Sequence, residues 1–103
     1  MAHYLVRALP KRDRLDELEV RIRAGDFIDL EPFGRALSNS LRNARRDGDY
    51  AIWEEEDYCN PPLAQERDAV LDDYFHDITV ETVERGEGWD QIEDLPRLFP
   101  GLE

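Results

Sequence analysis

The side chains best suited to chemistry lie close together between positions 50 and 63, in the stretch YAIWEEEDYCNPPL. Four consecutive acids, Glu54 to Asp57, follow an apolar beginning, and the single cysteine, Cys59, comes two positions later. Carboxylates at this density repel one another unless water, arginines, a cation or a basic partner offsets their charge. A thiol beside them could serve as a nucleophile if a base or a helix N-terminus activated it. The stretch therefore supports two interpretations, an acidic binding surface and a cleft with a reactive cysteine.

Residues 50–57 are expected to form a strand, in which side chains alternate between two faces. Both faces are apolar as far as Trp53 and acidic beyond it. The strand should thus begin inside the fold and leave it as an acidic rim, which consists of Glu54, Glu55, Glu56 and Asp57. Such a rim would suit a basic surface on another protein, because charges at the edge of an interface raise the association rate more than the affinity.

A helix is expected to follow this strand, since Asn60 is succeeded by two prolines and proline is tolerated in a first helical turn. Cys59 would then lie just before a helix N-terminus, and His3 is the only base that the topology could bring to it. A cleft between the strand end and this helix would contain four side chains, Trp53, Cys59, Glu66 and Arg67. The simpler interpretation is that Cys59 is a small buried residue and that Arg67 reaches back to the acids.

A possible metal-ligand spacing lies in residues 72–77, where Asp72 and Asp73 precede His76 by four and three positions. On a helix this spacing lets a carboxylate and an imidazole share one metal ion. The sequence has no second pair of this kind to complete such a site, so no metal ligand is assigned. Glycine-rich phosphate loops, CXXC and the motifs of serine hydrolases and zinc proteases are also absent. No catalytic residue and no cofactor is therefore predicted, and enzymatic activity stays an open question.

Length and charge narrow the range of functions. The 103 residues are expected to form one α+β domain, residues 1–103. The net charge is −12, and residues 1–48 contain 10 Lys and Arg against 8 Asp and Glu, whereas residues 49–103 contain 3 against 17. This balance argues against nucleic acid and anionic membranes as partners. A single cysteine excludes an internal disulfide, and no apolar run is long enough to span a membrane, so a cytoplasmic location is expected.

The apolar periodicity predicts strands at 3–9, 50–57 and 78–85. It predicts helices at 11–24, from Pro32 to just before Gly48, and at 62–75, with a short helical turn after Asp90. Residues 26–30 fit either a loop or a short strand. With a loop, the strands at 3–9 and 50–57 run antiparallel; with a strand, they run parallel. The strands at 50–57 and 78–85 should be parallel, because a helix connects them.

These elements indicate an α+β fold, a small mixed sheet of three or four strands with helices packed mainly on one face. A decorated ferredoxin-like plait is one arrangement that fits the order of elements. The other face of the sheet would stay open, and Trp53 or Leu5 could make it the interface of a homodimer.

The leading functional hypothesis is a small acidic cytoplasmic protein that acts by binding, with the rim at 54–57 contacting a basic surface on another protein. The alternative is a small ligand-binding domain or an enzyme with a cleft near Trp53, Cys59, Glu66 and Arg67. A thermal-shift screen with metals and metabolites separates the two, because only the second hypothesis predicts a response.

Overall fold

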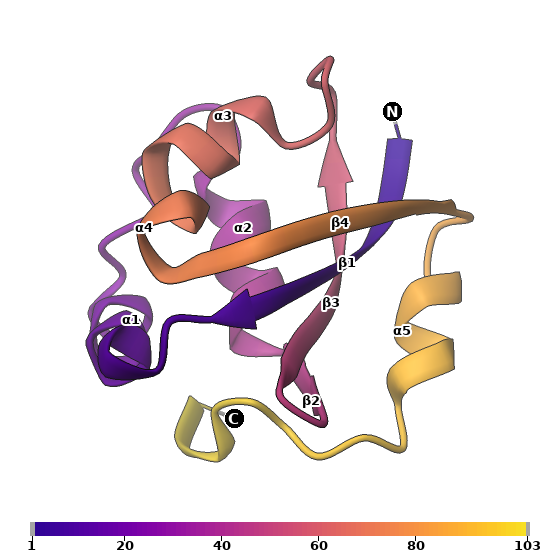
Figure 1. The fold of residues 1–103 in the computed structure, drawn as a ribbon. Coiled ribbons are helices and arrows are strands. Elements are labelled where there is room, and N and C mark those ends of the chain that lie inside the picture. Colours follow the sequence, from indigo (N-terminus) through magenta and orange to yellow (C-terminus); the bar gives the residue numbers. More distant parts are fainter. Residues whose placement is uncertain (1, 103) are drawn as a thin grey trace.

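The computed structural model describes residues 2–102, which form one sheet surrounded by helices (Figure 1). The strands are β1 (Ala2–Pro10), β2 (Arg45–Asp47), β3 (Tyr50–Asp57) and β4 (Phe75–Val83). The helices are α1 (Leu15–Ala24), α2 (Gly34–Arg42), α3 (Ala64–Glu66), α4 (Asp72–Tyr74) and α5 (Glu87–Ile92), and the short helical segments are η1 (Arg12–Arg14), η2 (Arg67–Leu71) and η3 (Pro100–Leu102). Since α3, η2 and α4 are consecutive, residues 64–74 form one helix with a π-helical middle. No helix within residues 2–102 has the length and apolar character needed to cross a membrane.

The strand order is β2-β3-β1-β4, and each neighbouring pair is antiparallel. β3 and β4 both run against β1, so they are parallel to each other, although β1 lies between them. A chain that alternates strands and helices in this way and returns its last strand beside the first has the topology of a ferredoxin-like plait. The predicted α+β class is therefore confirmed, but the expectation of a mixed sheet is wrong. The sheet is antiparallel throughout, because the parallel strands β3 and β4 are separated by β1.

Residues 25–30 turn the chain and form no strand, and the antiparallel direction of β3 relative to β1 is set by the hairpin between β2 and β3. The two helices α1 and α2 therefore follow one another between β1 and β2. β1 pairs antiparallel with β3, with Ala2 opposite Asp57 and Val6 opposite Trp53. Of the two alternatives for residues 26–30, the loop is the one that forms. The antiparallel pairing of β1 with β3 places His3 opposite Glu56, at the acidic end of β3.

Several boundaries differ from the expectation. The second helix was expected to continue to Gly48, but α2 ends at Arg42 and Arg45–Asp47 pair with the beginning of β3. Gly48, with φ of +61°, makes the tight turn of this hairpin. Pairing with β3 thus outweighs the helical propensity of the arginines, which is a weak preference. β4 and α5 both begin earlier than expected, at Phe75 and Glu87.

The core lies between one face of the sheet and the helices α1, α2 and 64–74. Val6, Ala8 and Trp53 point to this face and are fully buried, together with Leu37 of α2. The Trp53 ring lies 5.2 Å from that of Phe75, measured between centroids. Trp53 therefore belongs to the core, and the expectation that it lines an accessible cleft or an open dimer face is wrong.

The opposite face of the sheet is partly covered by α5, which lies beside the strands in Figure 1. A Cβ atom on Gly88 would lie 3.3 Å from Leu5 Cδ1 and 2.9 Å from Glu54 Oε1, and both side chains are on this face. The helix approaches the sheet this closely because Gly88 has no side chain. The open face is consequently smaller than the sequence pattern suggests.

Gly34, the first residue of α2, should tolerate no larger side chain. A Cβ atom there would overlap the Phe27 carbonyl oxygen and lie 2.8 Å from the Ile28 carbonyl oxygen, and neither backbone atom can move without displacing the turn. We expect Gly34→Ala to lower the free energy of unfolding by about 2 kcal/mol, measured by urea denaturation. Arg35 is exposed and adjacent, so Arg35→Ala is the control. Equal losses in the two variants would contradict the prediction.

Candidate functional site

The acidic rim expected at residues 54–57 is largely buried. Glu54, Glu55 and Asp57 keep 5%, 0% and 4% of their surface exposed, and Glu56 is half-buried. β3 is an inner strand between β2 and β1, with helices on one face and α5 against the other. The expectation of a solvent-exposed rim is therefore wrong, because β3 is still inside the fold where its sequence becomes acidic.

Glu54 anchors the beginning of α5. Its Oε1 accepts hydrogen bonds from the backbone N–H groups of Gly88, at 2.8 Å, and Trp89, at 3.3 Å. Its Oε2 accepts one from the N–H of Gly86 at 2.9 Å and lies 3.7 Å from His3 Nδ1. Three backbone donors at a helix N-terminus satisfy this carboxylate, so Glu54 has a structural role.

Asp57 fixes the turn that leads into the helix at 64–74. Its Oδ2 accepts a hydrogen bond of 2.6 Å from the N–H of Leu63, a residue in the left-handed conformation at φ +63°. Burial raises the pKa of Asp57, but hydrogen bonds from Leu63 and Glu66 outweigh it and hold the pKa below its ordinary value. The helix was expected to begin directly after Asn60. It begins at Ala64 instead, because Asp57 holds the preceding turn.

Asp57, Cys59 and Glu66 come together at this turn, and we refer to them as the carboxylate–thiol cluster. Cys59 Sγ lies 3.8 Å from Glu66 Oε1, and one ligand atom from each of the three residues lies within 4.8 Å of the others. Asp57 comes from the end of β3, Glu66 from the first turn of the helix, and Cys59 from the loop between them. Glu66 is fully buried and Cys59 is partly exposed, so the cluster reaches the surface at Cys59.

Glu55 adds a third buried carboxylate on the same face of β3 as Asp57. Trp53 Nε1 donates a hydrogen bond of 3.1 Å to its Oε1. The other oxygen, Oε2, is buried without a hydrogen-bond partner within residues 2–102, and so is Oε2 of Glu66. No ion pair in this part of the chain includes Glu55, Asp57 or Glu66. Three carboxylates thus share a buried region in which no lysine or arginine pairs with them.

Burial and mutual repulsion favour the protonated forms of two of these acids. Burial, and next the charge of Glu66, raises the pKa of Glu55 well above its usual range. Burial and the hydrogen bond with Asp57 raise the pKa of Glu66 to about 7. Near neutral pH the cluster therefore holds protons that a bound cation could replace.

Cys59 is a weak nucleophile in this environment. A hydrogen bond from the Gln65 backbone lowers the pKa of its thiol, but burial and the hydrogen bond to Asp57 raise it further, and the net effect is upward. Since the thiolate is the reactive form, the cluster does not activate Cys59 for covalent catalysis near neutral pH. A metal ion at the cluster would favour the thiolate as a ligand.

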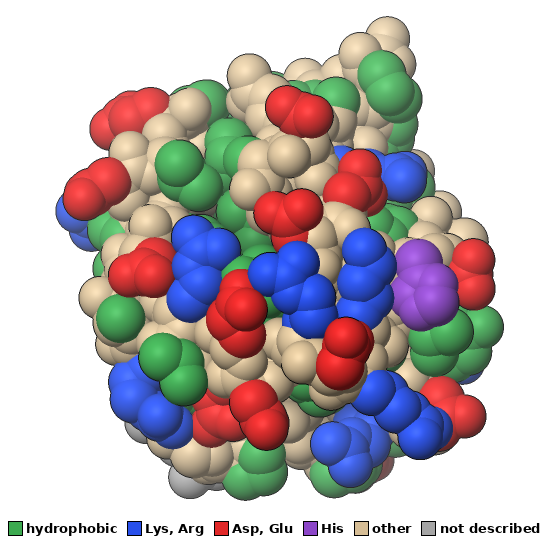
Figure 2. All heavy atoms as spheres, turned by 60° about the vertical axis from the view of Figure 1, so that its left-hand side comes forward, with side chains coloured by type: hydrophobic (Ala, Val, Ile, Leu, Met, Phe, Trp, Pro, Cys, Tyr) green, Lys and Arg blue, Asp and Glu red, His purple; other side chains and the backbone are tan. Residues whose placement is uncertain are grey.

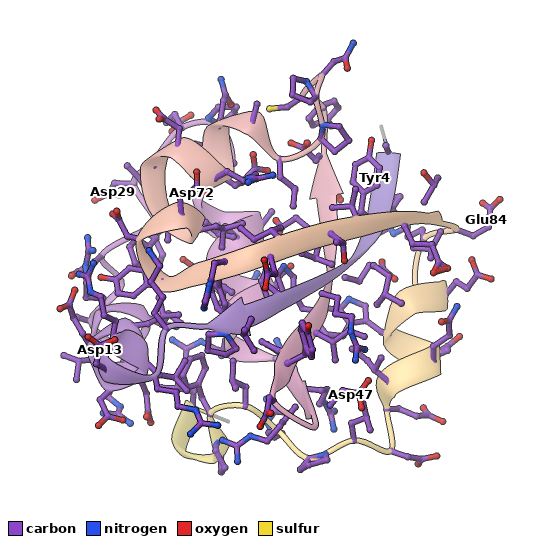
Figure 3. The ribbon with its side chains drawn as sticks, in the orientation of Figure 1. Tyr4, Asp13, Asp29, Asp47, Asp72 and Glu84 are labelled. Carbon is purple, nitrogen blue, oxygen red and sulfur yellow. The ribbon has the colours of Figure 1, made fainter. Side chains whose placement is uncertain are left out.

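Of the four residues assigned to the cleft, Cys59 and Glu66 lie together, whereas Trp53 is in the core. Arg67 is exposed, and its Nε lies 3.3 Å from Oδ1 of Asp72. Figure 3 shows Asp72 on the outer side of α4, away from the end of β3. The expected contact between Arg67 and the acids of β3 is therefore wrong. His76 lies in β4, so the helical spacing that relates it to Asp72 does not apply.

Comparisons of the chain with protein-family models, with curated proteins and with solved structures find no match. The carboxylate–thiol cluster has a weak sequence signal, Asp57 and Cys59 two positions apart with Glu66 seven positions further on. The role of Glu54 also has a weak sequence signal, which is the pair of glycines Gly86 and Gly88. In the structure the backbone N–H groups of both glycines donate to the Glu54 carboxylate. These glycines directly follow the strand expected at residues 78–85, and their position in the sequence did not indicate a contact with Glu54.

Proposed function

We propose that this protein is a divalent-cation-binding domain whose ligands are Asp57, Cys59 and Glu66. The observation that supports the proposal is the convergence of three ligand atoms within 4.8 Å, in a region where buried carboxylate oxygens lack partners. A cation would offset the charge of these acids and bind the unpartnered oxygen of Glu66. The proposal is a version of the alternative hypothesis from the sequence, a small ligand-binding domain with a cleft. Of the four residues expected in that cleft, it retains Cys59 and Glu66.

The ligand set favours zinc over magnesium or calcium. Magnesium and calcium bind oxygen ligands, whereas zinc accepts thiolate, carboxylate and imidazole groups in a four-coordinate site. Asp57, Cys59 and Glu66 supply three ligands, and a water molecule would take the fourth position. Bound zinc would supply a Lewis acid to any substrate that reached the partly exposed side of the cluster.

Protonation offers a second way to compensate the same charges, because a proton between Asp57 and Glu66 also reduces their repulsion. The two explanations differ in what happens when metal is added. A cation must displace the protons of Cys59 and Glu66, so binding near neutral pH should release protons to the buffer. Titration calorimetry in two buffers with different ionisation enthalpies measures this release directly.

We expect the metal-free protein to bind one zinc ion, and we expect Cys59→Ser to weaken the zinc Kd at least about tenfold, because a coordinating thiolate is lost. The measurement is calorimetric titration of zinc into the protein after treatment with a chelator. Arg67→Gln is the matched control, since Arg67 follows Glu66 directly but faces solvent. Equal affinities for the native protein and Cys59→Ser, or the absence of binding, would refute the proposal.

A cytoplasmic location is part of this proposal, because a free cysteine stays reduced and available as a ligand in that compartment.

Contact with a basic protein surface is a second candidate function. It would have to use exposed acids outside the predicted rim, and Figure 3 shows two of these, Asp72 and Glu84, on different sides of the molecule, so they do not form one acidic surface. Partner binding that is insensitive to salt would exclude this candidate. A homodimer through the open sheet face likewise stays a proposal, to be tested by sedimentation.

A further inference from the structure

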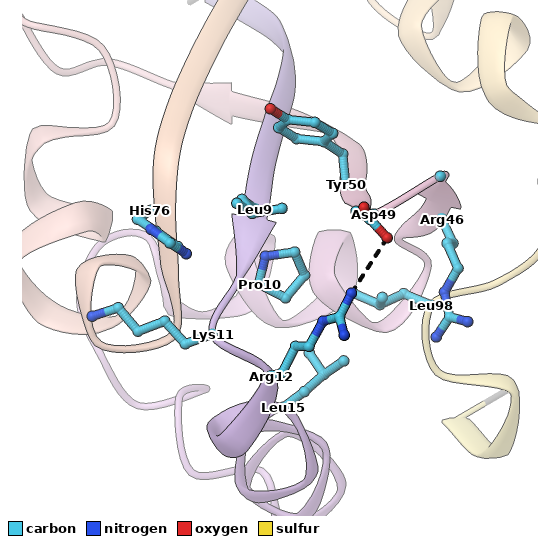
Figure 4. A pocket seen from close by; sticks show the side chains of 11 residues that line it. Leu9, Pro10, Lys11, Arg12, Leu15, Arg46, Asp49, Tyr50, His76 and Leu98 are labelled. Atoms are coloured by element: carbon cyan, nitrogen blue, oxygen red, sulfur yellow. Dashed lines mark ion pairs between the residues drawn. The ribbon is translucent and has the colours of Figure 1, made fainter.

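A cavity of about 580 Å³ lies at the end of the sheet opposite the carboxylate–thiol cluster. Its walls come from the end of β1, the β2–β3 turn, the beginning of β4 and the C-terminal segment (Figure 4). Tyr50, which lines it, is the first residue of β3, whereas Asp57 is the last of the strand's 8 residues. The two sites are thus separated by about 24 Å of strand and do not share residues.

Basic side chains from three parts of the chain surround the cavity. Lys11 and Arg12 follow β1, Arg46 belongs to β2, and His76 is the second residue of β4. Figure 4 shows Lys11 and His76 on one side, Arg12 in the middle and Arg46 on the other side. Because separate elements deliver these groups, their convergence is a property of the fold and not of a local basic run. Figure 2 shows Lys and Arg side chains in the middle of one face of the molecule, interspersed with Asp and Glu side chains.

These basic groups are only partly occupied by other partners. Arg12 Nη2 lies 3.5 Å from Asp49 Oδ1, but both side chains are strongly exposed, so this ion pair is weak. Lys11 Nζ donates a hydrogen bond of 2.7 Å to the Asp72 carbonyl oxygen and keeps further N–H donors. The guanidinium of Arg46 takes part in no ion pair within residues 2–102. Asp49 is the single acid among the lining residues, so the three Lys and Arg side chains leave a positive excess.

The remainder of the lining is apolar and includes an aromatic ring. Leu9, Pro10 and Leu15 line the cavity beside Leu98, and Tyr50 contributes its ring. Figure 4 shows the Tyr50 ring at the edge of the cavity, above Leu9 and Pro10. The ring is held in place by Arg7, whose guanidinium carbon lies 4.5 Å from its centroid. A ligand with a flat apolar part could pack on this surface while its charged end reaches the basic groups.

We propose that this cavity binds a small phosphomonoester that carries an aromatic group. A phosphomonoester has a charge between about −1.5 and −2 at neutral pH and three acceptor oxygens, which matches an excess of two basic groups and the donors from three elements. Arginine is suited to such oxygens because its guanidinium presents paired N–H donors. The protein as a whole carries a net charge of −12, so this cavity is a local exception that would draw the anion to one place.

Phenyl phosphate is the probe, and inorganic phosphate and phenol are its two fragments. We expect phenyl phosphate to shift the backbone amide signals of Arg12, Arg46 and Tyr50 in a saturable NMR titration, and to bind more tightly than either fragment. Arg46→Gln should weaken the Kd for phenyl phosphate by about tenfold, since one charged hydrogen-bonding group is lost. Arg23→Gln removes an exposed arginine of α1 outside the cavity and should leave the Kd unchanged.

Three outcomes would overturn the proposal: no saturable shift, saturable shifts at residues outside the cavity, or equal affinity in Arg46→Gln and the native protein. Binding of inorganic phosphate as tightly as phenyl phosphate would overturn the assignment of an aromatic group. Zinc binding at the opposite end has no part in any of these outcomes, so the two proposals succeed or fail separately.

Discussion

Replacing Glu54 by alanine is expected to lower the free energy of unfolding by about 4 kcal/mol, because hydrogen bonds to a charged group contribute more than neutral ones. The carboxylate accepts the N–H groups of Gly86, Gly88 and Trp89, and these donors would lose their partner together. The beginning of α5 would also lose the negative charge beside its N-terminus. Urea denaturation followed by circular dichroism measures the loss.

Glu56 provides the control for this experiment, since it lies on the same face of β3 two residues later and is half-buried. Glu56→Ala should cost less than about 1 kcal/mol, the usual range for partly exposed positions outside special features. Glu54→Gln keeps one acceptor oxygen and should recover part of the loss. If Glu54→Ala were no more harmful than Glu56→Ala, the anchoring role of Glu54 would be excluded.

The metal-free protein is expected to become less stable as the pH rises from about 4.5 to about 7. Burial and the hydrogen bond with Asp57 raise the pKa of Glu66 from 4.5 to about 7 in the folded state. In this window the unfolded chain has released a proton that the folded chain keeps, so folding is favoured below it and loses up to about 3 kcal/mol across it. Glu55, whose pKa is raised by burial, contributes in the same direction. The measurement is urea denaturation in a chelator at a series of pH values.

Glu66→Gln tests the origin of this pH dependence. Glutamine resembles the protonated acid in shape but cannot lose a proton, so the variant should lack much of the slope and be more stable than the native protein at pH values above about 7. Glu56→Gln changes a neighbouring, less buried acid and should leave the slope in place. Parallel stability profiles for Glu66→Gln and the native protein would show that the pH dependence arises elsewhere.

The prediction for Glu66 also connects stability with the proposed function. A buried acid that is destabilising once ionised needs a compensating charge, and natural proteins keep such groups mainly where they have a use. Zinc bound to the native protein would supply that charge, so the loss of stability at neutral pH should disappear when zinc is present. Glu66→Gln and Cys59→Ser together therefore separate the effect of the proton from the effect of the metal.

Much of the fold could be predicted from local patterns. Alternating residues indicated β1, β3 and much of β4, and the apolar spacing from Leu63 to Phe75 marked the buried side of the helix at 64–74. Gly25 ends α1 in the left-handed conformation, as a glycine after a periodic run predicts. These features depend on residues that are close together in the sequence, and for that reason they can be predicted from it.

The candidate site could be predicted only in part. Cys59 and Glu66 were expected in one cleft, between the end of the strand at 50–57 and the helix that follows it. In the structure they do lie together, with Sγ of Cys59 3.8 Å from Oε1 of Glu66. Trp53 and Arg67 were placed in the same cleft and lie elsewhere, since the direction of a side chain depends on which face of its element is covered. The cavity that contains Arg46 and His76 had no sequence signal, because its basic groups come from segments far apart in the chain.

Local sequence patterns predicted most of the strands and helices, though not β2, and they showed that a concentration of acids follows the apolar start of β3. The burial of these acids, in contrast, is a result of tertiary packing. Their access to water depends on β1, on α5 and on the helix at 64–74, which are brought to the end of β3 by the packing of the whole chain. Burial then changes the chemistry of the acids, because a carboxylate away from water must be capped, as Glu54 is, protonated, or bound to a cation.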